Sequence, residues 1–148
     1  MTAHINIGSN LGDSRAIIEA AVNEVAALST SGECRRSSIV ESEPWGYDSP
    51  NRFLNIGVDI DSDLEPLQLL HRLREIEERV AARFTPTNDH RNPDGTYRDR
   101  ALDIDIIIYG DVRMATPELT LPHPRAHLRP FVLAPLRELG HTDSLPLA

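Results

Sequence analysis

The 148-residue chain carries 15 basic and 23 acidic side chains, a formal charge of −8, and its length suits one domain spanning residues 1–148. The acidic balance opposes binding to nucleic acids or anionic membranes, and no apolar run reaches the roughly 18 residues of a membrane span. All 15 basic residues are arginines, which excludes a lysine Schiff base and a P-loop, and the single cysteine excludes an internal disulfide. We therefore expect a cytoplasmic monomer without nucleic-acid or membrane partners.

Hydrophobic periodicity predicts strands and helices in alternation along most of the chain. The clearest strand follows Phe53, where aliphatic residues occupy every second position, whereas the helical stripes repeat every three or four positions. The expected strands cover residues 4–7, 34–43, 53–60 and 102–109; the expected helices begin at Ser14 and Pro66 and cover 130–139; residues 84–99 form a long loop.

The order β-α-β-β-α-β predicts an α+β, ferredoxin-like fold: a four-stranded antiparallel sheet with both helices on one face, followed by the short C-terminal helix. The aliphatic side of each strand should meet the helices, and the other face should stay open. On the last strand this alternation places Ile104, Ile106 and Ile108 on the helix side. The open face is then expected to present five side chains: Asn6, Phe53, Asn55, Asp103 and Asp105.

The segment Asp103-Ile104-Asp105 is the most informative motif. Two aspartates at positions i and i+2 of a strand point to the same side, roughly 7 Å apart. Carboxylates at that spacing repel each other unless a cation lies between them, and hard oxygen ligands suit Mg²⁺. The alternative is a pair of solvated aspartates on an edge strand. Because aspartate is depleted in strands, we favour the metal site.

Other residues suggest phosphate and ring recognition. Arginines outnumber acidic residues in 83–100 and 118–137, on both sides of the aspartate pair, which suits a polyphosphate clamp; solvated loop arginines are the alternative. His123, fixed between two prolines, is placed to donate to a phosphate oxygen or has a structural role. Phe53 and Asn55 suit stacking on and hydrogen bonding to a flat heterocycle; a sheet face capped by loops is the alternative. Trp45 is placed either to close over such a ring or to fill the core.

Several segments together resemble a known family, the 6-hydroxymethyl-7,8-dihydropterin pyrophosphokinases of folate biosynthesis. The resemblance spans nearly the whole chain in order, and the stretches 100–105 and 122–131 are specific in combination. It rests on residues 7–13, residues 43–55, residues 100–105 (Arg-Ala-Leu-Asp-Ile-Asp), residues 121–127 (Leu-Pro-His-Pro-Arg-Ala-His), and Arg129 with 131–133.

The resemblance implies transfer of pyrophosphate from ATP to the hydroxymethyl oxygen of the pterin, with release of AMP and with two Mg²⁺ ions as cofactors. It implies metal ligation by Asp103 and Asp105, which with Arg83 and Arg100 form the catalytic set. The implied ATP-binding residues are Glu75, Glu78, Arg83, Arg100, Ile106, Thr120, His123 and Arg129. The implied pterin-binding residues are Ser42, Glu43, Trp45, Phe53, Asn55, Tyr97 and Phe131.

The chain also departs from the family pattern. Residues 82–85 lack the second arginine that commonly follows Arg83, and Tyr97 stands where a loop tryptophan is frequent. Two alternatives therefore stay open: another Mg²⁺-dependent, nucleotide-using transferase or phosphohydrolase with an Asp-x-Asp motif, and a non-catalytic ferredoxin-like binding domain. The second would need a basic, aromatic sheet face, whereas this face carries two aspartates.

Overall fold

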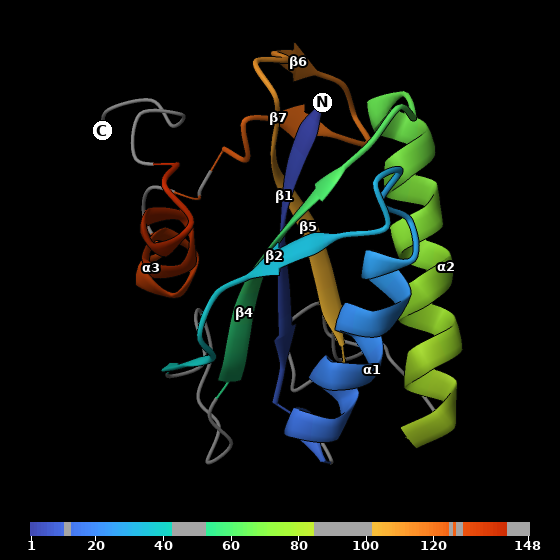
Figure 1. Ribbon diagram of the computed structural model, residues 1–148, viewed down its shortest axis with the longest axis vertical. Coiled ribbons are helices and arrows are strands. Elements are labelled where there is room, and N and C mark those ends of the chain that lie inside the picture. Colours follow the sequence, from blue (N-terminus) through green and yellow to red (C-terminus); the bar gives the residue numbers. More distant parts are fainter. Residues whose placement is uncertain (11–12, 43–52, 85–101, 125, 127–128, 142–148) are drawn as a thin grey trace.

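The computed structural model describes residues 1–10, 13–42, 53–84, 102–124, 126 and 129–141. Strands and helices follow the predicted order, with two short strands and a third helix after the last long strand (Figure 1). The elements are β1 (Thr2–Ser9), α1 (Ser14–Ala26), β2 (Cys34–Arg36), β3 (Val40–Ser42), β4 (Phe53–Asp61), α2 (Pro66–Phe84), β5 (Asp103–Tyr109), β6 (Met114–Ala115), β7 (Thr120–Leu121) and α3 (Pro130–Glu138). Within the described ranges, no helix is long and apolar enough to cross a membrane.

The main sheet is antiparallel, in the order β2-β4-β1-β5, and α1 and α2 cover one of its faces (Figure 1). The Asp13 side chain caps α1 by accepting a hydrogen bond from the Ala16 amide at 3.2 Å. Apolar stripes of both helices meet the aliphatic sides of the strands. The largest fully buried side chains are Ile5, Ile7, Ile17, Ile18, Ile56, Ile60, Leu69, Leu73, Ile76, Leu102, Ile104 and Ile106. This arrangement confirms the predicted α+β, ferredoxin-like fold and the C-terminal helix.

The strand predicted over residues 34–43 is divided into β2 and β3, both of which pair with β4. The break lies at two serines. The Ser37 hydroxyl accepts a hydrogen bond from the Gly57 amide at 2.8 Å, in place of a backbone carbonyl of the ladder. The Ser38 amide donates to the carboxylate of Glu138 in α3 at 3.0 Å. Side-chain hydrogen bonds therefore replace part of the sheet pairing here.

A β-bulge in β5 makes the prediction for Ile108 wrong. His4 pairs with Ile108 and Ile5 with Ile106, so Ile107 is an extra residue opposite β1. Beyond the bulge the alternation reverses: Tyr109 enters the core under α1 and α2, and Ile107 and Ile108 pack in a second cluster.

The second cluster lies under α3, on the face opposite α1 and α2 (Figure 1). The prediction that this face is left open is therefore wrong for the part that α3 covers. Val132 and Leu136 of α3 pack with Ile107 and Ile108, and the helix also lies against β3 and β4. Three side chains expected on an open face, Asn6, Asn55 and Phe53, are buried.

Gly57 allows α3 to approach the sheet closely. A Cβ atom at this position would lie 2.6 Å from Pro135 Cβ and 2.7 Å from His4 Cε1. We expect Gly57→Ala to lower the free energy of unfolding by about 2–3 kcal/mol, because neither neighbour is the free end of a flexible chain. Urea unfolding measures this. Gly32→Ala is the control: its added Cβ meets nothing within 4 Å, so only the left-handed backbone (φ +74°) costs about 1 kcal/mol. Equal losses in the two variants would contradict the close packing.

Candidate active site

The sheet register aligns the predicted polar residues in two neighbouring rows. Gly8 of β1 pairs with Asn55 on one side and with Asp103 on the other. Two residues along, Asn6 pairs with Gly57 and Asp105. A Cβ at Gly8 would lie 2.7 Å from Asn55 Oδ1, so the missing side chain of Gly8 leaves room for the Asn55 amide.

Asp103 and Asp105 lie on β5, which is an edge strand of the main sheet among the described residues. Side chains of α2 bind the backbone groups of Ile104, the residue between the two aspartates. Glu77 Oε2 accepts from the Ile104 amide at 2.7 Å, and Arg74 Nη1 donates to the Ile104 carbonyl at 2.6 Å. Arg74 Nη1 also lies 2.6 Å from Glu77 Oε2. This Arg74–Glu77 pair therefore fixes the backbone that carries both aspartates.

Three acidic side chains lie close to this short segment: Asp103, Asp105 and Glu77. Both aspartates are half-buried, and Arg74 Nη2 lies 3.7 Å from Asp105 Oδ1. Burial raises the pKa of Glu77 to about 8; the Arg74 charge opposes this shift, whereas Asp103 and Asp105 add to it. Glu77 Oε2 already accepts hydrogen bonds from the Ile104 amide and Arg74, so the carboxylate oxygens of Asp103 and Asp105 remain as ligands of the kind that a divalent cation prefers. Asp103 and Asp105 are the residues that would hold it.

A pocket of about 180 Å³ adjoins Asp105 and contains several of the residues predicted to bind ATP. His123, which lines this pocket, is tied to β5, because its amide donates a hydrogen bond to the Ile107 carbonyl at 2.8 Å. The structure thus brings four predicted residues together around one pocket: Asp105, Ile106, Thr120 and His123. Arg74 also lines this pocket.

The first turn of α3 contributes two further predicted residues. Arg129 precedes the helix, and its guanidinium carbon lies 6.0 Å from the centroid of the Phe131 ring. The same helix packs on β3 and β4, which carry Ser42 and Phe53, respectively. Asn6 lies nearby on β1; its Nδ2 is 3.4 Å from Asn55 Oδ1, and its buried Oδ1 has no hydrogen-bond partner within the described part of the chain.

Other predicted residues lie away from this set or outside the described residues. Arg83 contacts Glu24 of α1 at 3.5 Å, near the end of α2. Glu75 and Glu78 are exposed on α2. The predictions for Glu43, Trp45, Tyr97 and Arg100, and for the loop 84–99 beyond Phe84, concern residues outside the described ranges.

Sequence reasoning missed Arg74 and Glu77 as parts of the site. A signal for Glu77 was present, because it lies four residues after Leu73 and three before Val80, within the buried stripe of α2. A carboxylate on an apolar helix face requires a polar partner, and the Ile104 amide is that partner.

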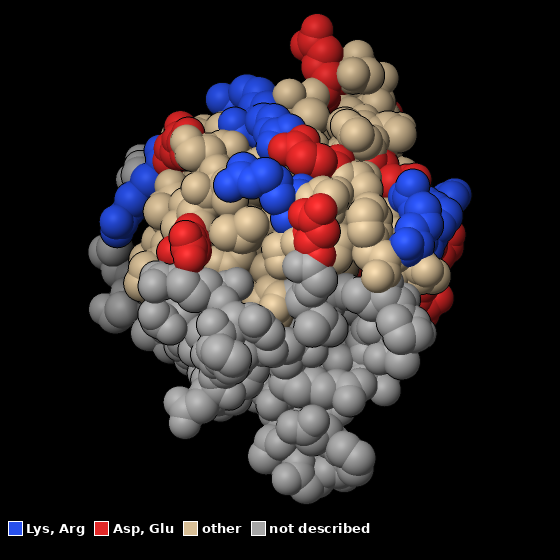
Figure 2. All heavy atoms as spheres, turned by 90° about the horizontal axis from the view of Figure 1, so that it is seen from below, with Lys and Arg blue, Asp and Glu red and all other residues tan. Residues whose placement is uncertain are grey.

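Charges on the outer surface near the strand ends are mixed. Figure 2 shows the end of the molecule that is lowermost in Figure 1; arginine and acidic side chains are interspersed over the part of this end that the structure describes. A continuous basic area, as nucleic-acid recognition requires, is not seen among those residues.

The fold and the acidic strand edge define a ferredoxin-like α+β protein with a candidate site for a divalent cation. Residues 4–141 match the family described as 7,8-dihydro-6-hydroxymethylpterin-pyrophosphokinase (HPPK). The chain therefore belongs to the HPPK family.

Curated relatives agree with this family. Three of them, each named 2-amino-4-hydroxy-6-hydroxymethyldihydropteridine pyrophosphokinase, come from Porphyromonas gingivalis, Bacillus subtilis and Haemophilus influenzae. The first is 37% identical over 138 residues, covering 93% of this chain and 89% of the relative. The second is 34% identical, covering 93% and 77%, and the third is 33% identical, covering 99% and 86%.

Proposed function

We propose that this chain transfers the pyrophosphoryl group of ATP to the hydroxymethyl group of 6-hydroxymethyl-7,8-dihydropterin. The hydroxyl oxygen bonds to the β-phosphorus, the bond from that phosphorus to the α–β bridging oxygen breaks, and AMP leaves while the hydroxyl proton is released. The pairing of Asp103 and Asp105 on one side of β5, in a chain of the HPPK family, is the observation that carries the proposal. The chain would act as a single domain, and as a monomer in the cytoplasm.

The two aspartates would bind magnesium, and we propose two ions, as the family resemblance implies. When bound, magnesium neutralises charge on the triphosphate and favours loss of the hydroxyl proton. The protein's own contribution is alignment and charge. Glu77 and Arg74 fix the Ile104 peptide groups, so that the carboxylates of Asp103 and Asp105 keep a fixed spacing.

The pocket beside Asp105 would hold part of the nucleotide. At about 180 Å³ it is smaller than the roughly 300–1,000 Å³ of a site that encloses a drug-sized ligand. Thr120 and His123 offer hydrogen-bond donors to phosphate oxygens there. Arg129, Arg83 and Arg100 are proposed to neutralise further phosphate charge, and Glu75 and Glu78 to contact the nucleotide.

The pterin would lie near Phe53, Asn55 and Phe131, on the face of the sheet that α3 partly covers. A flat ring with several N–H groups needs stacking partners and acceptors, and this region supplies aromatic rings and amides. The buried Oδ1 of Asn6 is one acceptor next to Asn55. Ser42, Glu43, Trp45 and Tyr97 complete the proposed set.

The nucleotide product tests this proposal. Incubating the protein with ATP, Mg²⁺ and 6-hydroxymethyl-7,8-dihydropterin is expected to give AMP and the pterin diphosphate in equal amounts, as measured by chromatography. Omitting the pterin should stop AMP formation, because the pyrophosphoryl group then has no acceptor. Chelating the metal with EDTA should also stop it, because the aspartates need the cation to bind the triphosphate. Formation of ADP in place of AMP would contradict the proposal and favour a different transferase.

A further inference from the structure

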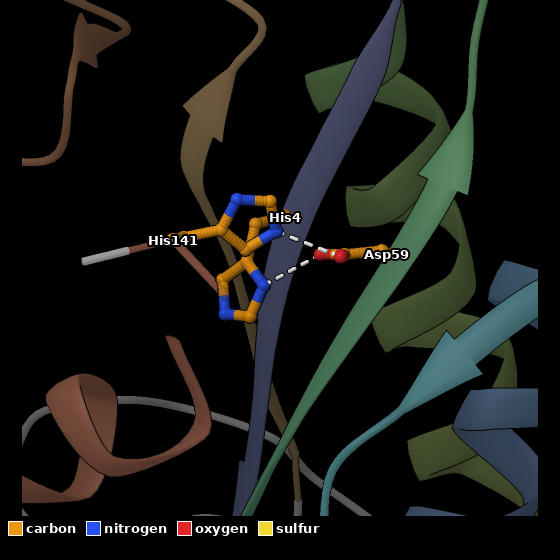
Figure 3. Close-up of side chains that lie close together, drawn as sticks. All are labelled: His4, Asp59 and His141. Carbon is orange, nitrogen blue, oxygen red and sulfur yellow. Dashed lines mark hydrogen bonds and ion pairs between the residues drawn. The ribbon is translucent and has the colours of Figure 1, made fainter. Parts of the chain in front are cut away.

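A buried charged cluster lies on the face of the sheet that α3 covers. His4 of β1 pairs with Asp59 of β4 in the ladder, and His4 Nδ1 lies 2.7 Å from Asp59 Oδ1 (Figure 3). His141, three residues beyond the end of α3, places Nε2 2.7 Å from Asp59 Oδ2 (Figure 3). His4 and Asp59 are 0% and 4% exposed. The three residues are called the His–Asp–His cluster below.

Arg35 of β2 completes the connection. Its Nη2 donates to Asp59 Oδ2 at 2.6 Å and to the backbone carbonyl of Leu139 at 3.0 Å. Two groups from the segment after α3, the His141 ring and the Leu139 carbonyl, are therefore bound to charged groups of the sheet. Together with the Ser38–Glu138 hydrogen bonds, these contacts tie the C-terminal end of α3 to the sheet.

The other end of α3 carries residues of the candidate active site. The helix has nine residues, about 13 Å in length, and Arg129 and Phe131 lie at its beginning. Pro135, in the middle, packs against the position of Gly57 and beside His4. If this short helix moves as a rigid body, releasing His141 at one end would also shift Phe131 at the other.

We propose that the His–Asp–His cluster is a positioning device that seats α3 on the sheet and thereby sets where Phe131 and Arg129 meet the substrates. The proposal rests on the pyrophosphokinase function proposed above. His141 is a positioning residue, since its contact is with Asp59 and the effect reaches the substrate through α3.

Protonation has a defined direction in this cluster. Burial lowers the pKa of His4 below its usual 6.5, and the charges of His141 and Arg35 act in the same direction. The hydrogen bond to Asp59 and the charge of Asp59 oppose this shift. Burial acts to raise the pKa of Asp59, but the hydrogen bonds from His4 and His141 leave it below its usual 3.8. At both groups the unfolded chain binds protons more readily than the folded chain. Stability is therefore lost as the pH falls, first below about 6.5 and again below about 3.8.

The second nitrogen of His4 explains why acid would release the helix. Its Nε2 is buried without a hydrogen-bond partner among the described residues, close to Gly57 and therefore to Pro135 of α3. A proton added to Nε2 would create an N–H group without an acceptor beneath the helix.

Two histidines and an aspartate this close together could instead bind a metal ion. One donor atom from each of the three residues lies within 4.8 Å of the others. However, both histidines already lie at hydrogen-bond distance from Asp59, and the Arg35 cation on the same carboxylate opposes a dication. A metal bound through Nδ1 of His4 would also leave its Nε2–H without an acceptor among the described residues.

The experiment compares wild type, His141→Ala and His141→Gln, with Arg36→Gln as the matched control. Glutamine keeps a donor for Asp59, whereas alanine removes it. Arg36 forms a surface ion pair with Glu19 at 2.7 Å, so its loss removes a charge pair without affecting the His–Asp–His cluster. At neutral pH and 25 °C, His141→Ala is expected to raise the KM for the pterin about fivefold or more, and His141→Gln and Arg36→Gln to leave it within about twofold.

Two further measurements separate a positioning role of the His–Asp–His cluster from a purely structural role and from a metal site. Hydrogen exchange of the amides of Val132, Leu133, Ala134 and Leu136 should be faster in His141→Ala than in His141→Gln, whether or not the protein is active. If wild type forms no AMP, the proposed function fails, and the exchange comparison still decides whether the cluster seats α3. An unchanged pterin KM in an active His141→Ala variant with only a lower Tm would overturn the positioning role. Zinc bound to the purified protein, with a Tm that falls in EDTA, would also overturn it in favour of a metal site.

Discussion

Replacing Asp103 or Asp105 by alanine is expected to lower kcat by roughly 10³-fold, equivalent to about 4 kcal/mol of transition-state stabilisation. Each carboxylate would supply metal ligands that the other cannot replace. Both side chains are only half-buried, so the free energy of unfolding should change by no more than about 1 kcal/mol. Steady-state AMP formation and urea unfolding measure the two quantities separately.

The control for these variants is Asp111→Ala. Asp111 is an exposed aspartate shortly after β5, so its removal changes the net charge equally without affecting the candidate site. We expect wild-type kinetics from it. Normal magnesium-dependent turnover in Asp103→Ala or Asp105→Ala would show that the carboxylates do not bind the essential metal.

The second large effect is expected at Glu77. Glu77→Ala removes the acceptor for the Ile104 amide and the partner of Arg74, which should cost about 3 kcal/mol of unfolding free energy. Because the backbone between Asp103 and Asp105 also loses its support, activity should fall roughly 10–100-fold, the range seen when groups that orient metal ligands are removed. Chemical denaturation and kcat/KM measure the two losses.

Glu77→Gln separates support of the backbone from a need for negative charge. The pKa of Glu77 is about 8, so its neutral form is well populated at pH 7, and glutamine resembles that form. Its side-chain oxygen can accept from both the Ile104 amide and Arg74. We expect most of the stability and activity to return in Glu77→Gln. A variant as impaired as Glu77→Ala would indicate that the ionised carboxylate itself is required.

The sequence predicted the elements well where one periodicity ran without interruption. The strand after Phe53 and the helix from Pro66 have regular apolar patterns, and their counterparts β4 and α2 are confirmed. The strand over 34–43 was predicted as one element because its polar residues showed no signal for a break. The hydrogen bonds that divide it involve Gly57 and Glu138, which lie far along the chain.

The bulge at Ile107 shows a limit of pattern reading. Residues 104–109 are apolar almost throughout, so a reversal of the alternation leaves no mark in the sequence. For the same reason, the sequence did not predict that Ile107 and Ile108 pack in the second cluster under α3. The expected open face was derived from α1 and α2 alone, and a short helix at the end of the chain carries no signal for which face it covers.

The candidate site was predictable in part because local spacing contains its central feature. Two aspartates separated by one residue on a strand must share a side, and the sheet register agrees with that. Glu77 was missed in favour of its neighbours Glu75 and Glu78, although its place on the buried stripe distinguishes it. The contacts of Asp59 with His4 and His141 span 55 and 82 positions and depend on the packing of α3, so no local pattern predicts them.

The most direct test of the account is a crystal structure of the protein with Mn²⁺ in place of Mg²⁺ and a non-hydrolysable ATP analogue, with anomalous scattering used to locate the metal. We expect a metal peak in contact with the carboxylates of both Asp103 and Asp105 and with oxygens of the triphosphate. Carboxylates that point apart, or a metal and triphosphate bound elsewhere on the molecule, would contradict the account.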